Sequence, residues 1–162
     1  MVIDVHNHNI ASQTGTPRYQ ARILIKHPSI DPKLISDVLD LKPDICWKYG
    51  EERKTPKGTI LPGTHKMSVW SHSFRVLGRK NFSQSIKDII DLFENNKLFI
   101  ENISISGGSV ELIIDIPGDI NVGDTIKYSD LFRICNLRVN LGFEVFPDFL
   151  RPPISSDTYN SP

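Results

Sequence analysis

The apolar alternation in the middle of the chain constrains the fold more than any other feature. Every second residue from 110 to 116 is apolar, as in a strand with one buried face. Gly107 and Gly108 precede this run, and Ile103 and Ile105 alternate before them. Because glycine readily adopts the positive φ that tight turns need, we expect a hairpin turned at these two glycines. The pattern therefore predicts a sheet with antiparallel strands.

The other periodic segments predict the rest of the architecture. Alternating apolar residues predict further strands over residues 19–26, 45–49, 67–74 and 139–145. Helical spacing predicts three helices, which begin near Asp31, Asn81 and Ser129. The predicted order is βαββα followed by ββαβ. We expect an α+β fold, a mixed and mostly antiparallel sheet with amphipathic helices packed on one face. The opening βαββαβ also fits an elaborated ferredoxin-like core.

We expect one domain over residues 19–149, flanked by flexible tails at 1–18 and 150–162. Both tails are rich in Asn, Ser, Thr and Pro and lack periodicity, whereas the 162-residue chain is long enough for one core. The first ten residues hold charged and imidazole side chains where a signal peptide needs an apolar stretch. No run approaches the roughly 18 apolar residues of a membrane span. We therefore expect a cytoplasmic protein without membrane contact.

The two cysteines, Cys46 and Cys135, are far apart and form no Cys-x-x-Cys pair. This spacing argues against both a disulfide framework and a zinc ribbon. We expect two buried, reduced thiols.

The sequence Asp4-Val5-His6-Asn7-His8 is the strongest candidate for a metal site. Two histidines two residues apart on a strand could bind one metal, and some metal-dependent hydrolases begin in this way. Those enzymes are barrels of about 250 residues with further ligands on later strands, and no comparable setting is evident in this chain. We also find no nucleophile elbow and no phosphate-binding loop. We predict no catalytic residues, no metal and no cofactor.

Charge is distributed unevenly, although the net charge is zero. Residues 42–80 hold nine basic and three acidic side chains, and residues 81–162 hold six basic and twelve acidic ones. The two regions either form a dipole that steers a charged partner or neutralise each other across one surface. Within the basic region, a long charged loop follows Trp47. A glycine followed by a charged run has no packing reason to be charged, so we interpret this loop as a candidate recognition surface. The candidate binding residues are Lys48, Glu51, Arg53, Lys57 and Trp70.

An ordered set of motifs runs through the first half of the chain. Asp31-Pro32 opens a helix that leads to Leu39, Leu41 and Lys42-Pro43, and Trp47, Gly50-Glu51 and Trp70-Ser71 follow. With this set, over roughly residues 19–146, the chain resembles the DUF4279 family. The resemblance implies a small bacterial protein of unassigned activity, in a family of which some members are suspected of serving as immunity or interaction proteins. The segment between Gly50 and Trp70 is longer than expected for this family.

Three functional hypotheses follow. The leading one is a non-catalytic protein-binding module, immunity-like or inhibitory, that binds another protein through the basic loop or the acidic second half. The alternative is a small-molecule or nucleotide-handling enzyme with a cleft near Trp47, Glu51 and Trp70, although both tryptophans also suit core packing. The third is nucleic-acid binding through residues 42–80, against which the acidic half argues because it would repel phosphates. The oligomeric state stays open.

Overall fold

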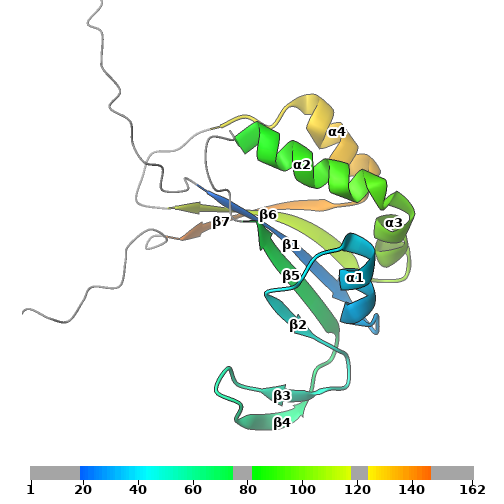
Figure 1. Ribbon diagram of the computed structural model, residues 1–162, viewed down its shortest axis with the longest axis vertical. Coiled ribbons are helices and arrows are strands. Elements are labelled where there is room, and N and C mark those ends of the chain that lie inside the picture. Colours follow the sequence, from blue (N-terminus) through cyan, green and yellow to red (C-terminus); the bar gives the residue numbers. More distant parts are fainter. Residues whose placement is uncertain (1–18, 75–81, 118–123, 147–162) are drawn as a thin grey trace, which may run out of the picture.

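The computed structural model describes residues 19–74, 82–117 and 124–146 (Figure 1). The elements in these segments are, in chain order, β1 (Gln20–His27), α1 (Pro32–Leu39), β2 (Ile45–Trp47), β3 (Glu52–Lys54), β4 (Ile60–Thr64), β5 (Ser68–Phe74), α2 (Phe82–Asn95), α3 (Lys97–Ile105), β6 (Ser109–Pro117), α4 (Tyr128–Asn136) and β7 (Asn140–Phe146). The two predicted tails, residues 1–18 and 150–162, lie outside the described residues. No helix in the described segments is both long and apolar enough to span a membrane.

The main sheet has five strands in the order β2-β5-β1-β6-β7. Its pairs are antiparallel except for β6 and β7, which are parallel. The elements β1, α1, β2, β5, α2–α3 and β6 follow the βαββαβ order, with β1 between β5 and β6, as in a ferredoxin-like core. The α4–β7 unit extends this core by one parallel strand. The α+β fold with a mixed, mostly antiparallel sheet is therefore confirmed.

The helices pack on one face of the sheet (Figure 1). Strand β1 shows why, because Ala21, Ile23 and Ile25 point to that face and are fully buried while their neighbours are only partly buried. The helices contribute their apolar stripes to the same core, including Ile35, Leu39, Ile86, Ile90, Phe93, Ile100, Ile103 and Ile134. The core thus lies between this face and the helices.

The opposite face of the sheet carries ion pairs across neighbouring strands. On this face Arg22 lies 3.2 Å from the Asp115 carboxylate and also pairs with Glu144, and Lys26 lies 3.1 Å from Glu111. Burial raises the pKa of Asp115 above its usual range, although the Arg22 guanidinium acts in the opposite direction. The predicted polar face of the first strand therefore forms ion pairs with β6 and β7.

The hairpin predicted at the two glycines is wrong. Residues 97–105 form α3, in which Ile103 is 1% exposed and Ile105 is 66% exposed. Ile103 packs together with Ile100, three residues earlier, as a helix requires, whereas a strand would bury Ile103 and Ile105 together. Gly107, with φ of +92°, follows the end of this helix, and the Gly108 N–H donates to the Ile103 carbonyl (2.8 Å). The second half is therefore αβαβ rather than ββαβ.

The first helix begins as the sequence predicts. The Asp31 side chain accepts a hydrogen bond from the Lys33 N–H (2.9 Å), and Pro32 occupies the first turn. On the next turn, the Ser36 hydroxyl accepts a hydrogen bond from the Trp70 indole (2.9 Å). Because Trp70 is a fully buried residue of β5, this bond fixes α1 against the sheet.

Candidate functional site

A hairpin projects from the body of the protein between β2 and β5 (Figure 1). We call residues 48–66 the arm; it contains β3 and β4, which pair with each other and with no other described strand. Every residue of β3 is exposed, and so are most residues of β4. The predicted charged loop is therefore an ordered hairpin that points away from the helices and adds little to the core.

The turn at the tip of the arm has a sequence signature. Pro56 and Gly58 occupy the second and fourth positions of the four-residue turn that begins at Thr55, as is typical of a type I turn. The Gly58 N–H donates to the Thr55 carbonyl (2.8 Å), and the Thr55 N–H donates to Thr59 (2.9 Å). Lys57 is therefore presented at the outermost point of a closed turn.

A second turn forms the base of the arm. Gly50 is the third residue of the turn 48–51 and has φ of +81°, which glycine adopts without strain. The Glu51 carboxylate accepts a hydrogen bond from the Lys48 N–H (2.9 Å) and so closes the turn. Across the hairpin, Gly50 donates to His65 (3.0 Å) and His65 donates to Glu51 (2.9 Å). These bonds continue the β2–β5 ladder into the arm.

Stacking of two aromatic rings also stabilises the base of the arm. The Trp47 and His65 rings are stacked, with centroids 4.8 Å apart and planes 18° apart. In addition, the Tyr49 N–H donates to the Ser68 hydroxyl at the start of β5 (3.0 Å). The base therefore has a fixed geometry relative to the sheet.

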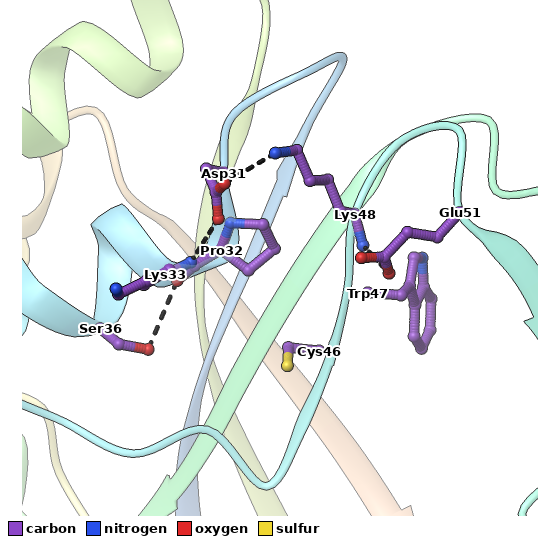
Figure 2. Close-up of a pocket in the computed structure, with 8 residues that line it drawn as sticks. All are labelled: Asp31, Pro32, Lys33, Ser36, Cys46, Trp47, Lys48 and Glu51. Carbon is purple, nitrogen blue, oxygen red and sulfur yellow. Dashed lines mark hydrogen bonds and ion pairs between the residues drawn. The ribbon is translucent and has the colours of Figure 1, made fainter.

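A cleft of about 440 Å³ lies between the first turn of α1 and β2 (Figure 2). Its lining residues are Asp31, Pro32, Lys33, Ser36, Cys46, Trp47, Lys48 and Glu51. The Lys48 ammonium lies 2.7 Å from Asp31. This hydrogen bond lowers the pKa of Asp31 and raises that of Lys48, so both groups are charged at neutral pH. Two of the four charged side chains that line the cleft thus already compensate each other.

Most cations of the arm have no such partner among the residues that the structure describes. Lys54 lies 3.8 Å from Glu52, but within the described part of the chain Arg53, Lys57 and Lys66 form no ion pair. The Arg53 guanidinium donates a long hydrogen bond to the Pro62 carbonyl (3.4 Å). An apolar side chain accompanies these charges, since Ile60 on β4 is 63% exposed. The arm thus presents uncompensated positive charge around an exposed isoleucine.

Four of the five predicted site residues lie on the arm. Lys48 and Glu51 lie at the base of the arm, Arg53 on β3 and Lys57 at the tip. Trp70 does not share this surface, because it is buried in the core, and it does not line the cleft. Sequence reasoning missed Ile60, although its position just after the Thr55–Gly58 turn signature indicates a hairpin strand.

The remaining candidate residues are the possible metal ligands and the two cysteines. Within residues 19–74, 82–117 and 124–146, no group of three or more His, Cys, Asp or Glu side chains could hold a metal ion. His6 and His8 lie outside the described residues. Both cysteines are exposed, so the prediction of buried thiols is wrong. Cys46 is exposed because β2 is an edge strand and the cleft opens beside it.

Comparison with known protein families shows to which family the chain belongs. Residues 17–120, well over half of it, match the family described as a domain of unknown function, DUF4279. The chain belongs to the DUF4279 family. The matched segment contains the βαββαβ core and the arm, whereas α4 and β7 lie beyond it. No curated protein and no solved structure matches this chain.

Proposed function

We propose that this DUF4279 protein is a non-catalytic protein-binding module, immunity-like or inhibitory, that binds an acidic surface of another protein through its arm. The observation that carries the proposal is the projection of an ordered, cationic hairpin away from the core. An isolated two-stranded hairpin is marginally stable in water, and this one buries little apolar surface. Because the hairpin adds little to the core, we attribute it to recognition rather than to folding.

The side chains of the arm define the partner's chemistry. Arg53, Lys57 and Lys66 supply positive charge without an ion-pair partner among the described residues. Ile60 supplies an apolar contact between them along the arm. A matching surface holds carboxylates around a shallow apolar pocket, so encounter is steered by charge and weakens as salt rises.

The base of the arm lowers the entropic cost of binding. Stacking of Trp47 on His65 and the hydrogen bonds of Gly50 and Glu51 hold the hairpin in one orientation before any partner arrives. Ordering a flexible loop on association costs about 0.5–1.5 kcal/mol for each immobilised side chain, and part of that cost is already met by folding.

The proposal is tested by capture with the intact chain. Tagged protein is exposed to native lysate at low and high salt, and a reproducible partner is purified and its Kd measured. We expect Arg53→Glu with Lys57→Glu to raise Kd at least about tenfold at low salt. Lys87→Glu, an exposed change of the same sign on α2, is the control and should leave Kd unchanged. Absence of a partner at both salt concentrations, or equal Kd for the arm and control variants, contradicts the proposal.

The cleft favours a second candidate, small-molecule binding near Trp47 and Glu51. Its volume falls within the range of about 300–1,000 Å³ that is typical of ligand pockets. A thermal-shift screen of metabolites and nucleotides tests this candidate. A ligand that stabilises the wild type but not Lys48→Ala supports it, whereas equal stabilisation of both proteins contradicts it.

A further inference from the structure

Strand β7 forms one edge of the main sheet and is unusually apolar for an edge. The other edge, β2, has only three residues, whereas β7 has seven. On the helix-facing side of β7, Phe143 is 56% exposed and Val145 is 65% exposed. Natural edge strands are commonly protected by Lys or Pro, and β7 contains neither.

Helix α4 continues this apolar surface beyond the sheet edge. Arg133 points toward α2, where it pairs with Asp91 and Glu94, so the opposite flank of α4 faces away from α2. That flank and the outer face carry Leu131, Phe132 and Tyr128, the last being 85% exposed. Because α4 leads directly into β7 and contacts it, the helix and the strand share one surface. We call this surface the β7 margin; its residues are Tyr128, Leu131, Phe132, Phe143 and Val145.

We propose that the β7 margin binds a second copy of this chain, with the two β7 strands antiparallel and the two sheets joined across a two-fold axis. Antiparallel pairing of identical edge strands is self-complementary, as a symmetric dimer requires. Charge favours a second copy because Glu144, the single charged side chain of β7, pairs with Arg22 of its own chain. The charge on β7 is therefore balanced within each copy, whereas the cationic arm selects an acidic partner.

The available area suits a reversible dimer. The five large apolar side chains of the margin are about half exposed or more, and together they offer roughly 500 Å² on each chain, since one aromatic side chain buries about 150–250 Å². Backbone pairing along β7 adds to this, which brings the interface close to the roughly 800 Å² per partner of a standard complex. The arm emerges at the β2 side of the sheet, opposite β7, so a dimer leaves both arms free.

Sedimentation velocity on the full chain over a wide concentration range tests the proposal. We expect a concentration-dependent species of twice the 18.4 kDa chain mass. Val145→Lys and Phe143→Lys, each at an exposed position, should raise the dimer Kd at least about tenfold. Ile60→Lys places the same charge on an equally exposed residue of the arm and should leave it unchanged. A monomer at all concentrations, or a dimer that both margin variants retain, overturns the proposal.

Hydrogen exchange distinguishes a second copy from other occupants of the edge. We expect protection of the β7 amides to increase with protein concentration and to be lost in Val145→Lys. Strong protection that does not depend on concentration would mean that the chain covers its own edge, and this result overturns the proposal as well.

Discussion

Replacing Ile103 with alanine tests whether residues 97–105 form a helix. The side chain is 1% exposed and packs within the main core, so its removal leaves a cavity that the surrounding elements cannot fill. Buried Ile→Ala substitutions cost about 2–5 kcal/mol, and we expect about 3 kcal/mol at this site. For a chain of this size that loss lowers Tm by about 6–12 °C. Urea unfolding followed by circular dichroism measures the free energy, and calorimetry measures Tm.

Ile105→Ala is the matched control for this prediction. In α3 this residue is 66% exposed, and its replacement should change the free energy of unfolding by less than about 0.5 kcal/mol. In a strand, residues two apart share one face, so both substitutions would be costly. Similar losses for Ile103→Ala and Ile105→Ala would refute the helix and restore the hairpin.

Further predictions concern three other sites. Burial lowers the pKa of His27 below its usual value of about 6.5, so the unfolded chain binds more protons than the folded one at mildly acidic pH. We therefore expect the free energy of unfolding to fall as the pH drops below about 6.5. Urea unfolding at about pH 5 and 8 measures this loss, which should be smaller in His27→Gln than in the wild type. In Gly108→Ala the new Cβ would lie 2.7 Å from the Lys26 carbonyl oxygen, and we expect the free energy of unfolding to fall by about 1–3 kcal/mol in urea unfolding. Gly142→Ala is the control, because its new Cβ would lie 3.3 Å from a side-chain atom that can move, and we expect a loss of less than about 1 kcal/mol. Trp47→Ala removes the ring stack at the base of the arm, worth about 1 kcal/mol, so amide exchange in β3 and β4 should rise about fivefold while β1 is unaffected.

The sequence predicts most of the sheet because alternation is unambiguous in strands with one buried face. The residues of β1 bury every second side chain, as their pattern indicates. The exception arises where two periodicities overlap. Ile103 and Ile105 fit a strand, but Ile100 and Ile103 fit a helix, and the glycine pair suits a hairpin turn and a helix end alike. Which of these side chains is buried in the folded protein decides between the two patterns. The sequence of so short a segment does not show which side chains are buried.

The sequence predicts the charged part of the candidate site but not the places of the two tryptophans. Charge and composition mark Lys48, Glu51, Arg53 and Lys57 as a surface, and the structure places them along the arm. Trp47 and Trp70 look alike in sequence, since both are tryptophans on alternating strands. The register of β2 and β5 separates them, because Trp70 pairs with Cys46 and Trp47 with Val69, which places the two rings on opposite faces of the sheet. Trp70 donates to Ser36 of α1 inside the core, whereas Trp47 stacks on His65 at the base of the arm.

Site-specific photo-crosslinking compares the arm with the rest of the surface. A photoreactive residue is placed at Ile60 in the arm or, in a separate protein, at Leu98 in α3, which is also highly exposed. Both proteins are irradiated with native lysate or with the purified partner. We expect a discrete, salt-sensitive crosslinked species from position 60 and none from position 98. Equal crosslinking from the two positions, or a partner captured only through position 98, would contradict a binding function for the arm.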